Sequence, residues 1–289
     1  MLKLFAPTLP ISDAERIWID DAFARLITLF GKDRARQVST IVPDIKYFPR
    51  EYDGSEAWAE MVILQVCRYM GIDRDRVLLD WYEIVSADED LRNSMPSWQG
   101  SGGRGSSGLY SKAAEGNRVH IRINRNNLDD PMALIGTVAH ELGHVILLAD
   151  ELISRDEPDM EPFTDLLTVY LGLGIFTANT AFRFSQWSSD RRGGWEVRRL
   201  GYLGEPMYGY ALARWAQLRD EEKPDWTRHL KLNVREYMNK SAKWLKKNSP
   251  GDPQRRLRNE TTWPPPPKPA EPVDRIEEAP GNFSGPSIS

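Results

Sequence analysis

The sequence contains a single cysteine, and this scarcity excludes two kinds of protein. With only Cys67 among 289 residues, the chain has no internal disulfide framework and no thiolate-rich metal site. Cys67 lies within an apolar helical pattern, which indicates a buried and chemically inert thiol. Any metal site in this chain must therefore be built from nitrogen and oxygen ligands.

Concentrated positive charge and long apolar runs are absent as well. The formal net charge is −4, and Lys and Arg form only short clusters such as Arg191-Arg192, so we expect no nucleic-acid partner. No eighteen consecutive apolar residues occur, and residues 1–7 are too short and proline-broken for the hydrophobic region of a signal peptide. These absences predict a soluble, cytoplasmic protein with no membrane partner.

What the chain does contain is enough apolar material for a large core. It is 40% hydrophobic, with 10 Trp, 10 Tyr and 9 Phe, which predicts one large domain over residues 1–247. From residue 248 the composition shifts to Pro, Gly, Ser and charge, so residues 248–289 are expected to form a disordered tail. The prolines at 264–267 could bind an aromatic-lined groove of a partner, although a passive tail is the simpler interpretation.

The most informative residues are His140-Glu141-Leu142-Gly143-His144, which match the HExxH pattern of zinc hydrolases. On a helix, four residues turn the chain by about 400° and advance it by about 6 Å, so the two histidines share one face and can share one ion. Glu141 lies about 100° away, where its carboxylate can reach a metal-activated water and act as a base. The alternative is a chance match on an ordinary amphipathic helix.

The flanking residues favour a helix with one functional face. Asp130-Pro131 provides an N-cap residue followed by proline at the first helical position. Thr137 shares the face of His140 and His144. The opposite face carries apolar residues at Ile135, Val138, Leu142, Val145 and Ala149. One face is therefore expected to pack, and the other to carry the chemistry.

A third ligand must come from elsewhere, because catalytic zinc usually takes three protein ligands. Acidic residues are frequent from 150 to 165, and for most of them a solvated loop is the simpler interpretation. The stretch Glu161-Pro162-Phe163-Thr164-Asp165 resembles the ExxxD element of the gluzincins, the thermolysin-like zinc peptidases. The resemblance implies that Glu161 is the third zinc ligand and that Asp165 hydrogen-bonds His140 from behind. Because proline restrains the residue before it, Glu161 should lie at the very start of its helix.

The whole pattern predicts an α+β fold with a zincin-like core and a mainly helical C-terminal half. We expect N-terminal helices and a small antiparallel sheet to about residue 130, metal-binding helices over 131–176, and C-terminal helices over 195–247. The individual elements expected are helices at about 12–31, 55–70, 206–218 and 226–245, a helix of Glu161 that continues to 176, and strands at 77–85, 109–113 and 118–124.

Two features near the expected cleft bear on substrate binding. By resemblance to the zincins, strand 119–123 would form the upper edge of the cleft and pair with extended substrate. His120 on that strand faces away from the apolar side, so a solvated or turn-bonded histidine is the simpler interpretation. Residues 94–108 are rich in Gly and Ser and predict a mobile loop, either a flexible insertion or a lid.

Together these patterns predict a zinc-dependent metallopeptidase that acts on a peptide or protein substrate. Zn²⁺ would be held by His140, His144 and Glu161, with Glu141 as the general base, although such a ligand set also accepts other divalent ions. A catalytically inactive zincin-like scaffold is one alternative. Another is a zinc peptidase dedicated to one intracellular partner, because the HELGH form also resembles cytoplasmic zinc peptidases that cleave repressors. Four residues are candidate donors to the oxyanion, with no spacing that selects one: Tyr202, Tyr208, Tyr210 and His229.

Overall fold

The structure, a computed structural model, describes residues 8–48, 50–82, 110–112, 118–149, 152–154, 157–188 and 203–248. Within these ranges the protein is α+β, as expected, and it is mostly helical with one small sheet. The Gly/Ser-rich loop at 94–108 and residues 249–289 of the predicted tail lie outside the described residues.

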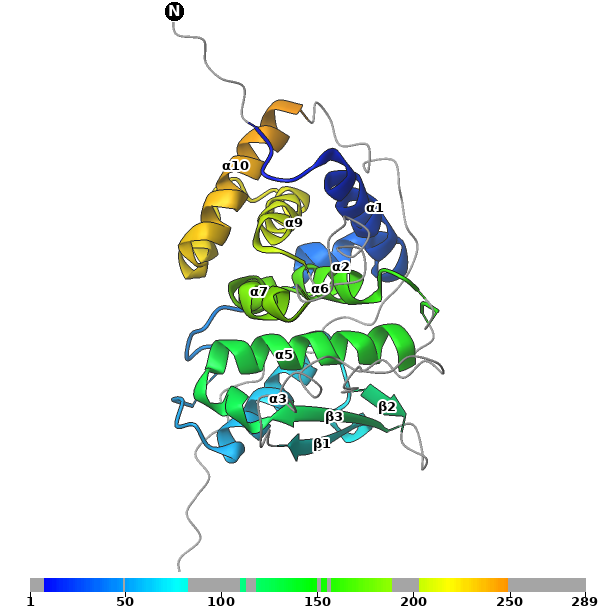
Figure 1. The fold of residues 1–289 in the computed structure, drawn as a ribbon, viewed down its shortest axis with the longest axis vertical. Coiled ribbons are helices and arrows are strands. Elements are labelled where there is room, and N and C mark those ends of the chain that lie inside the picture. Colours follow the sequence, from blue (N-terminus) through cyan, green and yellow to red (C-terminus); the bar gives the residue numbers. More distant parts are fainter. Residues whose placement is uncertain are drawn as a thin grey trace, which may run out of the picture.

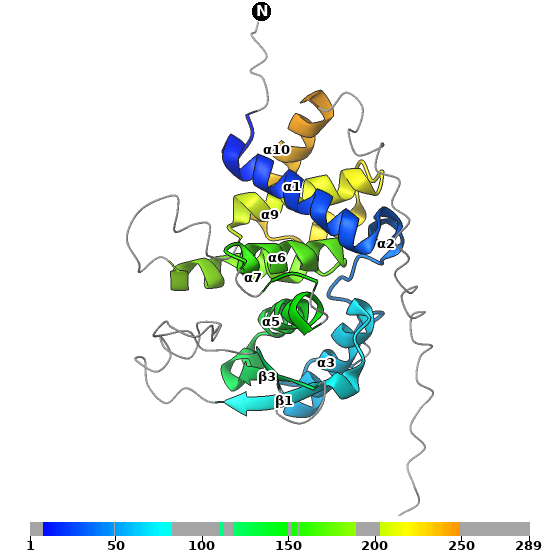
Figure 2. The same ribbon diagram turned by 90° about the vertical axis from the view of Figure 1, so that its right-hand side faces the viewer.

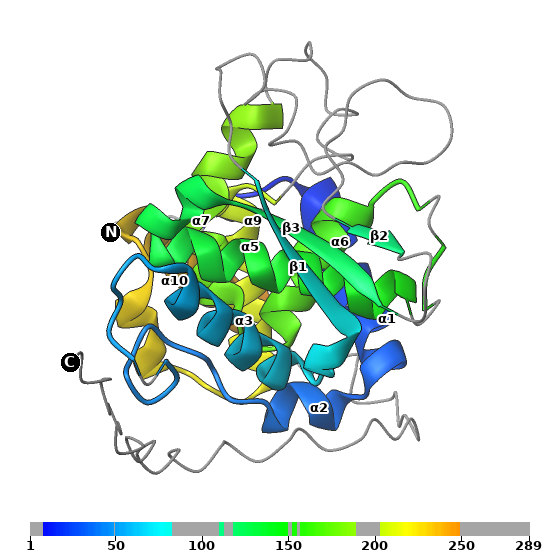
Figure 3. The same cartoon turned by 90° about the horizontal axis from the view of Figure 1, so that it is seen from below.

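Helix α5 (Pro131–His144), continued by one π-helical turn (Val145–Ala149), runs through the middle of the molecule (Figure 1). On one side lie α3 (Glu56–Met70) and the sheet, which Figure 3 shows from below. On the other side, α6 (Met160–Tyr170) and α7 (Gly174–Ser188) pack directly on α5. Beyond them lie α1 (Asp13–Phe30), α2 (Lys32–Gln37), α9 (Glu205–Leu218) and α10 (Leu232–Asn248) (Figure 2).

The sheet is mixed, so the prediction of an antiparallel sheet is wrong. Its strands are β1 (Val77–Tyr82), β2 (Tyr110–Lys112) and β3 (Val119–Asn124), in the order β1-β3-β2. β2 and β3 pair antiparallel, as a short connection requires, but β1 runs parallel to β3. The chain between β1 and β3 is long enough for either direction, and side-chain alternation within a strand does not reveal the direction of its neighbour.

This order also makes β3 the central strand, which corrects the prediction that it forms a substrate-pairing edge. Val119 pairs with Val77 on one side and with Lys112 on the other, so its backbone is already between two strands. His120 on the outer face lies 2.9 Å from a carboxylate oxygen of Asp80 on β1, through its Nδ1. It is a partly exposed, hydrogen-bonded histidine, in line with the simpler interpretation.

The two N-terminal helices begin where their capping residues predict. Ser12 and Glu15 form the expected reciprocal capping box at the start of α1. Ser55 caps α3, which ends at Gly71 in the left-handed conformation. Their apolar faces join the core beside α5 and α9.

Two C-terminal helix predictions need correction. The helix of Glu161 ends at Tyr170 rather than 176, because Gly172 has φ 84° and any Cβ there would overlap the carbonyl oxygen of Ser39. The helix expected over 226–245 is split: a 3-10 turn, η4 (Asp225–His229), precedes α10, which begins at Leu232. In the sequence, Gly172 is the residue that indicates this end of the helix.

One described helix is long and apolar enough to cross a membrane by composition alone. The window Pro131–Leu148 has a mean hydropathy of 1.4 over 18 residues, and 89% of it is buried inside the protein. Packing against α3, α6 and α7 accounts for this hydrophobicity.

Candidate metal centre

Both histidines are carried by α5, whose start follows from its capping residues. Asp130 accepts a hydrogen bond from the backbone N–H of Ala133 (3.1 Å), and Pro131 lies in the first turn. The helix continues without interruption through the HExxH residues, so the rings of His140 and His144 lie on one face, with their centroids 4.8 Å apart. Both residues are buried, at 4% and 5% exposure.

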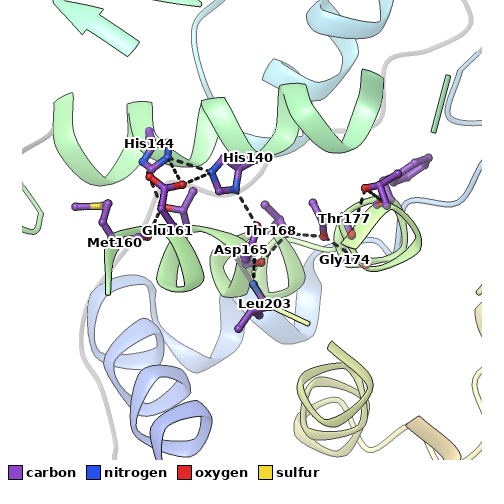
Figure 4. A network of polar contacts seen from close by, with 12 residues as sticks. His140, His144, Met160, Glu161, Asp165, Thr168, Gly174, Thr177 and Leu203 are labelled. Carbon is purple, nitrogen blue, oxygen red and sulfur yellow. Dashed lines mark hydrogen bonds and ion pairs between the residues drawn. The ribbon is translucent and has the colours of Figure 1, made fainter. Parts of the chain in front are cut away.

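The third side chain comes from the first turn of α6. Glu161 is the second residue of this helix, as the proline after it predicted. Its Oε2 lies 2.9 Å from His140 Nε2 and 3.4 Å from His144 Nε2, and the two nitrogens are 3.1 Å apart. These three potential ligand atoms all lie within 4.8 Å of one another, which is close enough to hold one metal ion (Figure 4).

The opposite nitrogen of each imidazole is held by a residue of α6. His140 Nδ1 lies 2.8 Å from Oδ1 of Asp165, and because an ionised carboxylate only accepts, the imidazole donates. Thr164 Oγ1 donates its single hydrogen to the carbonyl oxygen of Met160 (2.8 Å), so it accepts from His144 Nδ1 at 3.3 Å. Both rings therefore carry a hydrogen on Nδ1 and turn Nε2 toward the shared centre.

Asp165 also connects this centre to the C-terminal helices. Its second oxygen accepts a hydrogen bond from the backbone N–H of Leu203 at 2.9 Å, just before α9 (Figure 4). Tyr208 of α9 lies close enough that burial and the charge of Asp165 raise the pKa of its hydroxyl well above the ordinary value. The contact between Asp165 and His140 that the resemblance implied is thus present and is braced by a second element.

The carboxylates and imidazoles shift one another's pKa values. Burial alone would lower the pKa of His140, but hydrogen bonds and charges from Asp165 and Glu161 outweigh it and hold that pKa well above its usual value. Burial alone would raise the pKa of Glu161, but His144 and His140 bring it far below its ordinary range. At Glu141 burial dominates and raises the pKa of the carboxyl, against the lowering effect of the two histidines.

The donor set fits a divalent metal. Tetrahedral zinc with bonds of about 2.0–2.1 Å keeps its nitrogen and oxygen ligands roughly 3.3 Å apart. The three separations here, 2.9, 3.1 and 3.4 Å, are close to that value. Two imidazole lone pairs and one carboxylate oxygen that face one point repel one another unless a proton or a cation lies between them. Zinc accepts these ligands, and other divalent ions do as well.

Sequence reasoning missed two groups that support the centre, one bound to an imidazole and one bound to Asp165. Thr164 had a signal, since it lies three residues after Glu161 and therefore on the same helical face. Its role requires the packing of α6 against α5, which the sequence alone does not supply. Leu203 contributes a backbone N–H, and a backbone group leaves no trace in residue type.

The residues considered as oxyanion donors are engaged elsewhere or lie outside the described residues. Tyr208 is buried, and its hydroxyl interacts with Asp165 and Thr177. The hydroxyl of Tyr210 donates to a carboxylate of α1 at 3.0 Å. The ring of His229 contacts the arginine before it in η4, and Tyr202 lies outside the described ranges. Each of the three described candidates therefore has an interaction with a group other than the three ligand atoms.

Comparison with protein-family models, with curated proteins and with solved structures finds no match for this chain. The chemistry of the centre is therefore inferred from its donor atoms, their distances and their burial.

Proposed function

We propose that this protein is a zinc-dependent metallopeptidase with a zincin-like active site. The observation that supports this function best is the convergence of His140 Nε2, His144 Nε2 and Glu161 Oε2, with Glu141 buried in the same group of charges. Two imidazoles and one carboxylate are a ligand set typical of zinc enzymes that hydrolyse peptide bonds.

The chain's own residues have the properties that this chemistry needs. A zinc ion held by the two histidines and Glu161 would supply Lewis acidity, which polarises a peptide carbonyl and lowers the pKa of water. Glu141 accepts the proton of the attacking water and returns it to the leaving amine. The upward shift of the pKa of Glu141 suits this role, because the group must both take up and release a proton. Asp165 and Thr164 keep the imidazoles in the tautomer that leaves Nε2 available.

The first experiment measures metal content and hydrolysis on the same preparations of the full chain. Metal is determined by mass spectrometry without added metal or chelator, and hydrolysis by the appearance of new N-termini in a peptide library. We expect about one zinc per chain and cleavage in the wild type. Glu141→Gln should retain the zinc and lose cleavage, because it removes the base and no ligand.

A matched control is Glu60→Gln, which makes the same chemical change at an exposed position of α3. It should retain both zinc and cleavage. Zinc below a tenth per chain that persists after zinc is offered would overturn the metal site. Full zinc occupancy with no cleavage of the library would overturn general peptidase activity and favour a scaffold or an enzyme dedicated to one partner.

A further inference from the structure

Glu161 is the one candidate ligand that α5 does not carry, so its position depends on what holds the first turn of α6. Asp159 is the N-cap residue of α6, but its side chain makes no hydrogen bond to the N–H groups of its own helix. Pro162 removes a further N–H donor from this turn. The start of α6 therefore lacks the self-capping that usually fixes a helix terminus.

Helix α1, which packs along α6 (Figure 2), supplies an anchor in place of the cap. The indole Nε1 of Trp18 donates to Oδ2 of Asp159 at 2.9 Å, so α1 uses the carboxylate that would otherwise cap α6. Two helical turns further on the same face, Arg25 donates twice to Glu157, at 3.0 and 3.4 Å. Its guanidinium also lies over the ring of Phe163, 4.9 Å from the centroid. These contacts lie on both sides of the ligand glutamate along the chain.

The ion pair between Arg25 and Glu157 adds little to the stability of the whole fold. The side chains of Arg25 and Glu157 are 41% and 28% exposed, and ion pairs at that exposure contribute little to folding. These contacts matter more for the position of the first turn of α6 than for folding free energy, because a displacement of that turn moves Glu161 away from both imidazoles. A ligand shifted by about 1 Å no longer meets the bond lengths that zinc requires.

We propose that Trp18 and Arg25 are positioning residues of the metal centre, through which α1 holds the first turn of α6 so that Glu161 faces the two histidines. This inference rests on the proposed zinc site and extends it to the N-terminal helix, more than 130 residues away in the chain.

The test measures zinc affinity of the full chain by competition with a chromogenic chelator, at a temperature where every variant is folded. Arg25→Glu and Glu157→Arg should each weaken zinc binding about tenfold, the lower end of the effect of outer-shell partners. The double variant restores the ion pair with reversed charges and should recover affinity to within about threefold of the wild type. Trp18→Phe keeps the ring, removes the N–H donor and should also weaken binding.

Two matched controls separate positioning from general loss of stability. Arg16→Glu reverses a charge on the same helix, at a residue that pairs with Asp13 and Asp20 instead of α6. Trp226→Phe removes another indole donor to a carboxylate, Glu221, at 2.8 Å. Both controls should bind zinc as the wild type does. The visible spectrum of the cobalt-substituted chain gives a second measure, because displaced ligands should alter it in the single variants of Arg25, Glu157 and Trp18 and leave it unchanged in the two controls.

The outcomes distinguish this inference from the proposed function. A wild type that binds no divalent metal would overturn both. A wild type that binds zinc, with Arg25→Glu and Trp18→Phe within twofold of its affinity, would overturn only the role of α1. Equal weakening in the two controls, or no recovery in the charge-reversed double variant, would also show that α1 does not position the ligand.

Discussion

Substitution of Gly143 by alanine should loosen the metal centre by forcing its two helices apart. A Cβ at this position would lie 2.7 Å from Cγ2 of Thr164, where α5 and α6 meet. The threonine is fully buried, and its hydroxyl is bound to Met160 and to His144. Rotating its methyl group away would break these hydrogen bonds, so the simplest relief is a shift of α6 by roughly 1 Å, toward ordinary carbon contact distances.

The expected loss of stability follows from one stabilising and two destabilising contributions to the free energy of unfolding. Alanine improves helix propensity over glycine by about 1 kcal/mol. Overpacking in a closed interior costs about 1–3 kcal/mol, and loss of the hydrogen bond between His144 and Thr164, which a shift of α6 away from α5 would break, costs about 1 kcal/mol. The net result is a destabilisation of roughly 2 kcal/mol, or a fall in Tm of about 4–8 °C. Because α6 carries Glu161, zinc affinity should also fall at least tenfold.

The measurement pairs thermal unfolding with zinc affinity, and Gly136→Ala serves as the control. That Cβ would lie 3.0 Å from Thr180 Oγ1, so it also crowds α5, but against α7, which carries none of the three candidate ligands. The control should change Tm and leave zinc affinity within about twofold of the wild type. If Gly143→Ala retains both the Tm and the zinc affinity of the wild type, the close approach of the two helices does not control the site.

Two further predictions concern metal binding and pH. Zinc at a concentration of about 1,000 times its Kd should stabilise the fold by about 4.1 kcal/mol, which raises Tm by roughly 8–16 °C. Differential scanning calorimetry with and without EDTA measures this rise in Tm, and the His144→Leu variant should show none. In the metal-free chain the raised pKa of His140 means that its contribution to stability is complete below the unfolded value of about 6.5 and is lost as pH rises through the folded value. The lowered pKa of Glu161 acts at acidic pH, because its contribution to stability is present above about pH 4.3 and is lost on acidification. Urea unfolding of the metal-free chain across pH 3–9 measures the free energy of unfolding and tests both pH dependences. In the Asp165→Asn variant this free energy should fall less steeply above pH 6.5. An equally steep fall in that variant would contradict the assignment to His140.

Local signals predicted the elements of the fold well, and their relative arrangement poorly. Capping residues such as Ser12, Ser55 and Asp130 fix helix starts because they satisfy backbone N–H groups within a few residues. The direction of β1 relative to β3 depends instead on a long connection and on packing, and neither is encoded in strand periodicity. The early end of α6 was readable only in part, because Gly172 signals a break but its close approach to Ser39 is a tertiary contact.

The candidate site shows the same division. His140 and His144 lie four residues apart on one helix, so secondary structure alone brings them together. Glu161 and Asp165 required a resemblance to select them among many acidic residues, and the structure brings both to His140. The groups that brace the site, from Thr164 to the anchor at Arg25, come from helix packing and could not be predicted from spacing.

In the metal-free chain a proton can occupy the place that the site offers to a metal. His140 carries a raised pKa and its Nδ1 hydrogen already goes to Asp165, so the additional proton lies on Nε2. That hydrogen faces two acceptors, Glu161 at 2.9 Å and His144 at 3.1 Å, and so relieves the repulsion among the three donor atoms. Zinc binding must displace this proton, so zinc affinity should fall as pH drops below the raised pKa of His140. The same contacts that preorganise the ligands therefore also make the proton their competitor.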